Sequence, residues 1–366
     1  MAPNESQKLR VLIADDMLLF QKIIKEVLDE IPGVEVVGTA TDGIETLLKT
    51  ATLKPDLITL DVEMPKLDGL EVLMEIKSRS LNSEAIIVSG LSDHAAEITA
   101  HALQIGAFDF ILKPDGAEGL KSNMETLSAS LKPRIEAFIA SRNVTASMVS
   151  SAKKSLPTEK ARTAPVDIVA IASSTGGPAA LQQILSGLSP QLSVPIVVAQ
   201  HMTRGFTKPL AESLNRTTGL QVVEAEQNVA IQPGYVYIAP GGMNMQITKK
   251  HGRFVCDIQD EPGPFSAKPN ANILFRSITQ QFGSTGMGVV LTGMGNDGSI
   301  GAAELKMKGG LIVAQDQRTC TVYGMPRAVV EAGVANEVLP LGKIAQRINN
   351  LARTKSDNRA LVASET

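Results

Sequence analysis

The stretch DLITLDVEMPKLDG, residues 56–69, joins a short apolar run to an acidic residue and a turn. Its first five residues are typical of a buried strand, and Asp61 follows that strand directly. Similar short runs occur on either side, at Leu9–Ala14, Val34–Ala40, Ala85–Ser89 and Phe108–Leu112. Amphipathic stretches such as Met17–Glu30 lie between them. This alternation predicts five β-α units, and therefore a parallel sheet with helices on both faces.

Strand-like runs resume in the second half of the chain, at Val166–Ala172, Pro195–Gln200, Leu220–Ala225, Tyr235–Ala239, Met287–Leu291 and Gly310–Ala314. We therefore expect a second α/β domain, doubly wound and mostly parallel, over residues 166–350. Residues 131–165 are expected to form a linker, because most of this stretch is rich in Ser, Thr, Ala and Lys. Residues 1–130 make up the expected first domain, and residues 351–366 a polar tail.

The composition limits the possible functions. The 366 residues carry a formal net charge of −3, with 43% hydrophobic and 20% charged residues, which disfavours a nucleic-acid-binding protein. Cys256 and Cys320 lie far apart in no metal-binding spacing, so we expect two buried thiols in a reducing cytoplasm. The polar N-terminus lacks a signal-peptide pattern, and no apolar run approaches the ~20 residues that span a bilayer. We expect a soluble, cytoplasmic protein without membrane insertion.

Three acidic residues of the first domain follow strand ends. Asp15 and Asp16 come after the first strand and Asp61 after the third. The carboxyl ends of parallel strands meet at one edge of the sheet, so these carboxylates would repel one another unless a divalent cation such as Mg²⁺ neutralised them. Asp61 could then attack a phosphoryl donor. The alternative for each acid taken singly is an ordinary helix N-cap.

Two further polar residues end the next strands. Ser89 ends the fourth strand, where its hydroxyl could bond a phosphoryl oxygen. Lys113 follows the fifth strand and could pair with the same group as a point charge. With the three acids, they form a set of five residues placed for phosphoryl chemistry.

Four motifs in this half stand in the order found in response-regulator receivers: ADD (14–16), DVEMPKLDG (61–69), VSG (88–90) and LKP (112–114). The first domain resembles that family, which implies a flavodoxin-like (βα)5 fold. The resemblance implies that Asp61 is the phosphoacceptor. It also implies that Asp15, Asp16 and Asp61 bind Mg²⁺, helped by the carbonyl group of Glu63.

An aromatic residue near the last strand end is a candidate switch. Phe110 lies three residues before Lys113 and occupies the aromatic switch position of the receiver family. Charge added at Asp61 would shift the packing around Ser89 and Phe110. The alternative is that Phe110 is a plain core aromatic.

One of the four histidines stands at a strand end in the second domain. His94, His101 and His251 fit solvated helix or turn positions, whereas His201 follows the apolar run PIVVAQ. A histidine at the carboxyl end of a strand is well placed to act as a general base.

The first strand of this domain runs into the turn SSTGGP, residues 173–178. Such a turn exposes a hydroxyl at the sheet edge, and the following helix N-terminus favours a developing oxyanion. The pattern is half of a nucleophile elbow, because a glycine stands two residues after Ser174 but Ala172 stands two before it. A phosphate-binding turn or a plain N-cap would fit the same letters.

A glycine-rich stretch, LTGMGNDG at residues 291–298, follows a third strand. Asp297 lies just before the next helix and could be no more than its N-cap. Yet Ser174, His201 and Asp297 each follow a separate strand, and one crevice could collect them as nucleophile, base and orienting acid.

Five motifs of the second domain match the chemotaxis protein-glutamate methylesterase family in order: IASSTGGP (171–178), AQHMTRGFT (199–207), YVYIAPGG (235–242), LTGMGNDGSIGA (291–302) and YGMPRAV (323–329). The resemblance implies that Ser174 is the nucleophile, His201 the general base and Asp297 the acid that orients it.

Residues around this triad follow from the same resemblance. The backbone amide of Met294 would contribute to an oxyanion hole, and Thr175 and Met202 would line the site. The sequence departs from the family at three places: Met243-Asn244 where a histidine is frequent, Ser173 where alanine is usual, and Asn272 where an acid is common. We expect none of these departures to touch the triad.

The resemblance implies partners and a regulated reaction. The substrates would be methyl-accepting chemotaxis receptors, whose glutamate γ-methyl esters are hydrolysed and whose glutamines are deamidated, and the phosphodonor a chemotaxis histidine kinase. Mg²⁺ would serve receiver phosphorylation only, with no cofactor for ester hydrolysis. The unphosphorylated receiver would lie across the active-site entrance.

Three other readings fit parts of the sequence. The second domain could be a binding module, which would not need a serine, a histidine and an acid at separate strand ends. A dinucleotide-binding domain could use STGGP as its phosphate loop, but the full G-x-G-x-x-G pattern is missing. A DNA-binding output domain is disfavoured, because there is no basic recognition helix.

Overall fold

The computed structural model describes residues 8–114, 120–148, 164–260 and 268–352. The chain divides into two compact units, Met1–Ala146 and Ser147–Thr366.

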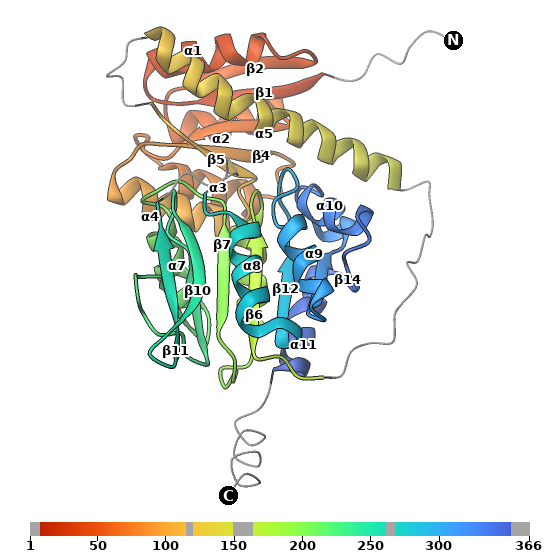
Figure 1. Cartoon of the computed structure of the whole chain (residues 1–366). Helices are drawn as coiled ribbons and strands as arrows, with labels where there is room; N and C mark the ends of the chain where they lie inside the picture. The colour runs from red at the N-terminus through yellow and green to blue at the C-terminus, as the bar shows by residue number, and fades with distance from the viewer. Residues whose placement is uncertain (1–7, 115–119, 149–163, 261–267, 353–366) are drawn as a thin grey trace, which may run out of the picture. The chain divides into compact units, whose positions relative to one another are not determined.

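The first unit is a five-stranded parallel sheet in the order β2-β1-β3-β4-β5 (Figure 1). Its strands are β1 (Leu9–Ala14), β2 (Val34–Ala40), β3 (Leu57–Asp61), β4 (Glu84–Ser89) and β5 (Asp109–Leu112). Its helices are α1 (Leu18–Asp29), α2 (Gly43–Leu53), α3 (Gly69–Ser78), α4 (Asp93–Gln104) and α5 (Leu120–Met148). The expected five β-α units are confirmed.

Helix α5 extends the first unit beyond the boundary expected at residue 130. It continues to Met148, and the division between the units falls at residues 146 and 147. Leu131, Ile135 and Phe138 are buried, so this part of the expected linker belongs to the core of the first unit. The later part, residues 149–163, and the expected tail from residue 353 lie outside the described residues.

The second unit is a seven-stranded, wholly parallel sheet in the order β14-β13-β12-β6-β7-β9-β8 (Figure 1). Its strands are β6 (Ile168–Ser173), β7 (Ile196–Gln200), β8 (Gln221–Glu224), β9 (Tyr235–Ile238), β12 (Gly286–Val290), β13 (Leu311–Gln315) and β14 (Glu337–Leu339). The chain starts at the central strand β6, adds β7, the edge strand β8 and then β9 between them on one side, and continues on the other side from β12. Strand order therefore reverses beside β6, which is where ligands bind in open α/β sheets.

The helices of the second unit fall into two contacting groups. One group is α8 (Ala271–Phe282), α9 (Ser299–Met307) and α10 (Met325–Glu331); the other is α6 (Gly177–Ser186), α7 (Thr207–Thr217) and α11 (Leu341–Leu351). Alternate residues of β6, namely Ile168, Ala170 and Ala172, join the core that contains the apolar face of α8. This arrangement confirms the doubly wound domain predicted from the sequence.

The turn position expected for His251 is confirmed, and two further elements complete this unit. An antiparallel hairpin, β10 (Asn244–Lys250) with β11 (Arg253–Gln259), forms a separate two-stranded sheet, and His251 lies in its turn. The short strand β14 adds an edge to the main sheet. Both cysteines are free thiols; Cys256 is buried as expected, whereas Cys320 is only partly buried.

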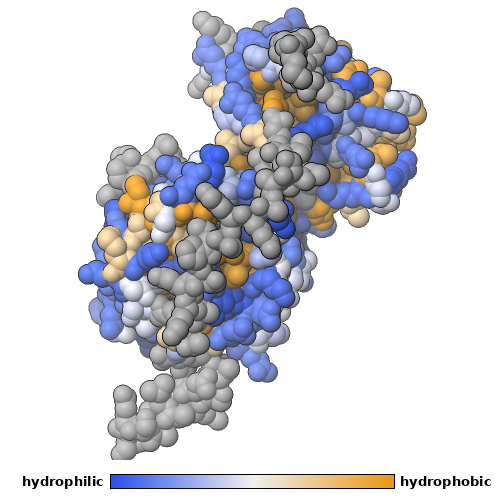
Figure 2. All heavy atoms as spheres, turned by 90° about the vertical axis from the view of Figure 1, so that its right-hand side faces the viewer, coloured by the Kyte–Doolittle hydropathy of each residue, from blue (hydrophilic) through white to orange (hydrophobic). Residues whose placement is uncertain are grey.

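Polar residues predominate on the surface of the protein. Figure 2 shows that hydrophilic residues cover much of the visible face, with apolar residues gathered in smaller patches. None of the helices in the described part of the chain has the length and apolar character that crossing a bilayer requires.

Candidate functional site

The turn after β6 places Ser174 at the sheet edge. The Ser174 amide donates to the Thr292 carbonyl at 3.0 Å, and the Ser174 carbonyl accepts from the Gly177 amide at 2.7 Å. Gly176 has a φ of 75°, in the left-handed region that favours glycine. The turn is therefore tight, and it leads at once into α6.

Strand β7 brings His201 next to this turn. Ser173 pairs with Gln200 across the parallel strands β6 and β7, so Ser174 and His201 are the next residues on neighbouring strands, which lie about 4.8 Å apart. The His201 amide donates to the Ser173 carbonyl at 2.9 Å, which extends the ladder to the histidine.

Gln200 was not among the residues predicted from the sequence. Its side chain forms hydrogen bonds that hold Ser174 and His201 in place. Its Nε2 atom donates to the carbonyls of Ser174 and His201, each at 3.0 Å, and its Oε1 atom accepts from the Ser173 hydroxyl at 2.6 Å. A Cβ atom at Gly177 would lie 2.0 Å from that Oε1 atom, so the glycine makes room for the brace. Ser173 is fully buried and its hydroxyl is hydrogen-bonded to Gln200, whereas Ser174 is half-buried.

Asp297 completes a hydrogen-bonded pair with the histidine. Its Oδ2 atom lies 2.7 Å from His201 Nε2 and also accepts from the Ala271 amide at 2.7 Å. Its Oδ1 atom accepts from the Gly298 amide at 2.8 Å. The start of α8 and the loop before α9 therefore both point amide groups at this carboxylate.

The electrostatics keep Asp297 ionised. Burial alone would raise its pKa, but hydrogen bonds from His201, Ala271 and Asn272 outweigh burial and hold the pKa below its usual value. A carboxylate at Nε2 favours the tautomer that carries its proton there, which leaves Nδ1 as the acceptor. His201 is thus arranged to accept a proton on the ring nitrogen that does not face Asp297.

The glycine-rich loop after β12 lies against the serine. A Cβ atom at Gly293 would be 2.7 Å from Ser174 Cβ, so only glycine allows this approach. The Gly293 carbonyl accepts from the amides of Gly324 and Met325, at 3.1 and 2.9 Å. Because a trans peptide points its C=O and N–H in opposite directions, these bonds also fix the direction of the Met294 N–H.

Thr175 and Met202, the two expected lining residues, are buried next to the two strand ends. The Thr175 carbonyl accepts from the Thr292 hydroxyl at 2.9 Å, which ties the serine turn to the loop after β12.

The prediction that the three departures leave the triad untouched is wrong for Asn272. Its side-chain Nδ2 donates to Asp297 Oδ1 at 2.6 Å, and its backbone amide donates to the same oxygen at 3.2 Å. Asn244, at another departure, accepts from the Asn270 amide at 3.0 Å and so orders the start of α8. Sequence spacing alone could not reveal these contacts, because they join segments 25 and 26 residues apart.

The first unit contains an acidic cluster at the carboxyl ends of β1 and β3. One side-chain oxygen from each of Asp15, Asp16 and Asp61 lies within 4.8 Å of the others. Lys113 Nζ is 2.9 Å from Asp15 Oδ2 and 2.6 Å from Asp61 Oδ2. An all-oxygen, acidic donor set of this kind fits Mg²⁺.

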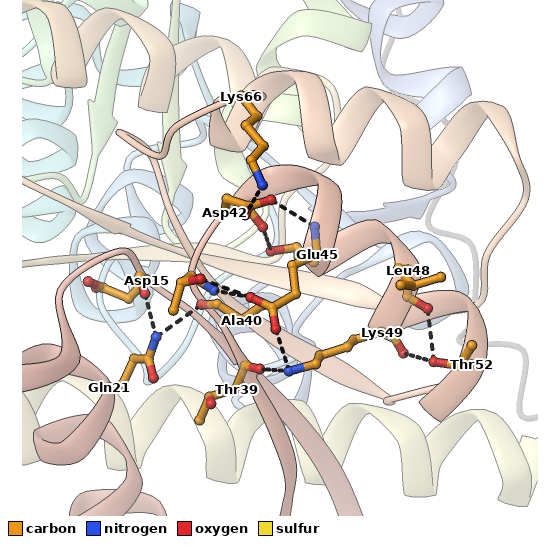
Figure 3. A network of polar contacts seen from close by, with 12 residues as sticks. Asp15, Gln21, Thr39, Ala40, Asp42, Glu45, Leu48, Lys49, Thr52 and Lys66 are labelled. Atoms are coloured by element: carbon orange, nitrogen blue, oxygen red, sulfur yellow. Dashed lines mark hydrogen bonds and ion pairs between the residues drawn. The ribbon is translucent and has the colours of Figure 1, made fainter.

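Figure 3 shows the polar network that holds the loops around this cluster. Gln21 donates through Nε2 to the carbonyls of Asp15, at 2.6 Å, and Ala40, at 3.1 Å. Lys66, in the loop that follows Asp61, forms an ion pair with Asp42, the N-cap of α2, at 2.6 Å. The loops after β1, β2 and β3 are thereby tied to neighbouring elements.

The other predicted residues of the receiver lie on β4, on β5 and in the loop after β3. The Ser89 hydroxyl donates to the Gly90 carbonyl at 3.1 Å and accepts from Thr99 at 2.8 Å, so it is engaged with α4. Phe110 is buried in β5. The Glu63 amide donates to Asp61 Oδ1 at 3.3 Å, and the metal role of its carbonyl stays a prediction.

We expect Mg²⁺ binding by the receiver to weaken in acid. Burial and the neighbouring Asp15 carboxylate raise the pKa of Asp61 to about 6, although Lys113 acts in the opposite direction. Below that pH a proton competes with the cation, so the apparent affinity should fall about tenfold between pH 7 and pH 5. Titration calorimetry with MgCl₂ checks this, and Asp61→Asn should remove most of the pH dependence. Equal affinity at pH 7 and pH 5 would contradict the assignment.

Comparisons with known proteins agree with both units. The response regulator receiver domain model matches residues 11–125, and the CheB methylesterase model matches residues 169–348. A protein-glutamate methylesterase/protein-glutamine glutaminase of Lawsonia intracellularis is 39% identical over 353 residues, covering 93% of this chain and 98% of the relative. One of Desulfotalea psychrophila is 40% identical, with coverage of 93% and 98%.

A solved structure supports the same assignment for the second unit. The crystal structure of the Thermotoga maritima CheB methylesterase catalytic domain is 40% identical, with a TM-score of 0.50, and covers 51% of this chain and 98% of that one. The two relatives are covered over 98% of their own length. The two family-model matches span the receiver cluster and the Ser174, His201 and Asp297 segments. The chain therefore belongs to the protein-glutamate methylesterase/protein-glutamine glutaminase family.

Proposed function

We propose that Ser174, His201 and Asp297 form a catalytic triad that hydrolyses glutamate γ-methyl esters on chemotaxis receptors. The observation that carries this proposal is the 2.7 Å contact between His201 and Asp297, with Ser174 on the adjoining strand end. A buried, paired carboxylate that orients a histidine beside a serine is the arrangement of serine hydrolases on several unrelated folds.

The reaction proceeds in two halves. Ser174 Oγ attacks the ester carbonyl carbon while His201 Nδ1 takes its proton, and the Met294 N–H donates to the oxyanion. The intermediate collapses, His201 protonates the departing methoxide, and methanol leaves a glutamyl ester on Ser174. Water then attacks this ester, His201 takes a proton from the water and returns one to Ser174, and a free glutamate side chain is released. With a glutamine substrate, ammonia leaves instead of methanol.

The receiver is proposed to control this reaction. Asp61 would accept a phosphoryl group from a chemotaxis histidine kinase, with Asp15, Asp16 and Asp61 holding Mg²⁺ for that step alone. Lys113, which already contacts Asp61, would pair with the added charge. In the unphosphorylated protein the receiver would block access to Ser174. The cytoplasmic location likewise stays a prediction.

Methanol release from methylated receptors tests the proposed function. The full chain should release methanol, and a small phosphodonor with Mg²⁺ should raise the rate. Asp61→Asn should keep the basal rate and lose the increase. Absence of methanol release under both conditions would refute the esterase activity.

A truncation tests the proposed inhibition separately. Removal of residues 1–150 should raise basal methanol release, because the blocking receiver is gone. The domain of Thermotoga maritima that was crystallised by itself supports the choice of this fragment. An unchanged basal rate would exclude simple autoinhibition while leaving the triad proposal standing.

A further inference from the structure

Arg204 lies three residues after the candidate base His201, and the proposed reaction gives it no role. Its side chain is 68% exposed, in the loop between β7 and α7. Three residues of chain span at most about 11 Å, so the Arg204 Cα atom lies within that distance of the His201 Cα atom. The Arg204 guanidinium group can therefore reach the surroundings of an ester that is bound at the triad.

The backbone at Arg204 is held in place, although its side chain is in solvent. A Cβ atom at Gly241, in the turn after β9, would lie 2.3 Å from the Thr203 carbonyl oxygen and 2.8 Å from the Arg204 amide nitrogen. The Gly241 amide donates to Thr207 Oγ1 at 2.8 Å. The turn after β9 and the loop after β7 therefore pack backbone against backbone, and the Arg204 side chain leaves the surface from a fixed point.

One end of the β10–β11 hairpin connects Arg204 to the acid of the triad. The Arg204 guanidinium Nη2 atom is 3.4 Å from Asp260 Oδ2, directly after β11. The same end of the hairpin carries Asn244, whose side chain accepts from the Asn270 amide at 3.0 Å. The residue after Asn270 donates its amide to Asp297 Oδ2 at 2.7 Å. Arg204 and Asp260 therefore lie on the triad side of this hairpin.

The ion pair between Arg204 and Asp260 is weak. Both side chains are mostly exposed, and exposed pairs of this kind contribute little to stability. Lys268 Nζ donates to the Asp260 carbonyl at 3.0 Å and lies 3.4 Å from Asp260 Oδ1. Two cations thus share one carboxylate, which leaves one positive charge in excess, and Asp260 keeps Lys268 as a partner when Arg204 turns away. Arg204 can therefore exchange Asp260 for another carboxylate at little cost.

We infer that Arg204 is a substrate-recognition residue: its guanidinium group binds a carboxylate of the receptor that lies within about 11 Å of the methyl ester. The inference rests on the proposed function and names the acidic surroundings that this chain selects around the ester. On a helical segment that distance corresponds to about two turns of 5.4 Å each. The planar guanidinium group can bind both oxygens of such a carboxylate.

The experiment measures kcat and KM for methanol release from methylated receptors by the full chain, with the small phosphodonor and Mg²⁺ present. Arg204→Glu should raise KM about 3- to 10-fold at low ionic strength, because repulsion replaces attraction, and should leave kcat unchanged. In about 1 M NaCl, where the Debye length is about 3 Å, the increase should shrink to about twofold or less. Arg204→Lys keeps the charge, so its KM should stay within about threefold of that of the unsubstituted chain.

A matched control and an altered substrate show whether the effect comes from a carboxylate of the receptor. Arg253→Glu makes the same change in net charge at an exposed residue on the opposite end of the same hairpin, and its KM should stay within about twofold. Receptors whose acidic residues within two helical turns of the ester are changed to alanine should raise the KM of the unsubstituted chain, with no further rise in Arg204→Glu.

Three results would overturn the inference. The first is an unchanged KM in Arg204→Glu at low ionic strength. The second is an equal rise of KM in Arg253→Glu, which would show an effect of net charge alone. The third is a rise of KM in Arg204→Glu that persists with the altered receptors, because no receptor carboxylate would then be involved.

The same assay separates this inference from the proposed function. If the unsubstituted chain releases methanol and Ser174→Ala does not, the triad proposal stands and the Arg204 variants test recognition alone. If Ser174→Ala retains activity, the triad proposal itself fails, and the inference fails with it.

Discussion

Ser174→Ala is expected to abolish methanol release, with kcat lowered by up to about 10⁶-fold, because no other group can take the place of the attacking oxygen. The fold should persist, since hydrogen bonds of the Ser174 backbone hold the turn. Methanol assays with circular dichroism as a fold control check both parts.

Ser173→Ala is the matched control for that experiment. Its hydroxyl is buried and donates to Gln200, so its loss should cost about 1 kcal/mol of stability and leave most of the activity. If Ser173→Ala lost activity and Ser174→Ala kept it, the nucleophile assignment would be wrong.

Asp297→Asn is expected to lower kcat by about 10⁴-fold, the loss seen when an orienting carboxylate in a serine hydrolase becomes an amide. The carboxylate accepts from His201 and from the amides of Ala271, Asn272 and Gly298. An amide group has one accepting oxygen, so its NH₂ group must face donors. Either His201 loses its partner or its tautomer changes.

Kinetics at several pH values test the Asp297→Asn prediction. Because the pKa of Asp297 is held below its usual value, the acid stays ionised throughout the neutral range. The loss should therefore not be recovered anywhere between pH 6 and pH 9. Activity within tenfold of the unsubstituted chain would show that Asp297 does not orient the base.

The positions of the candidate site residues were largely predictable because parallel sheets collect polar groups at strand ends. Three of these residues lie at the end of a short, apolar strand or directly after it: Asp61, Ser174 and His201. The structure contains those strands where the sequence pattern predicts them. The periodicity of the sequence thus located the edge of each sheet where chemistry could occur. It could not show which side chains at that edge touch.

The contacts that support the site required the structure. Gln200 is the last residue of β7 and reads as an ordinary strand residue, yet it braces two carbonyls on neighbouring strands. Asn272 reads as a helix residue, and its partner lies 25 positions away. The Gln200 contacts depend on the pairing of β6 with β7, and the Asn272 contact depends on the packing of α8 against the start of α9. No local sequence pattern encodes either arrangement.

The periodicity of the sequence places the end of the first unit later than its composition does. Leu127, Leu131, Ile135 and Phe138 recur at helical spacing and are all buried. This apolar stripe crosses the boundary expected at residue 130. Composition favoured a linker over residues 131–165, whereas the periodicity of its first part indicates a packed helix.

The tautomer of His201 decides whether this histidine can act as the base, because the proton transfer requires a proton on Nε2 and an unprotonated Nδ1 facing Ser174. Nitrogen-15 NMR of the full chain in alkaline buffer, where neutral imidazole dominates, can resolve four histidines, and His201→Gln identifies the signal. We predict that neutral His201 carries its proton on Nε2, and that this protonation pattern changes in Asp297→Asn. A neutral His201 that is protonated on Nδ1, both in the unsubstituted chain and in Asp297→Asn, would contradict the assignment of His201 as the base.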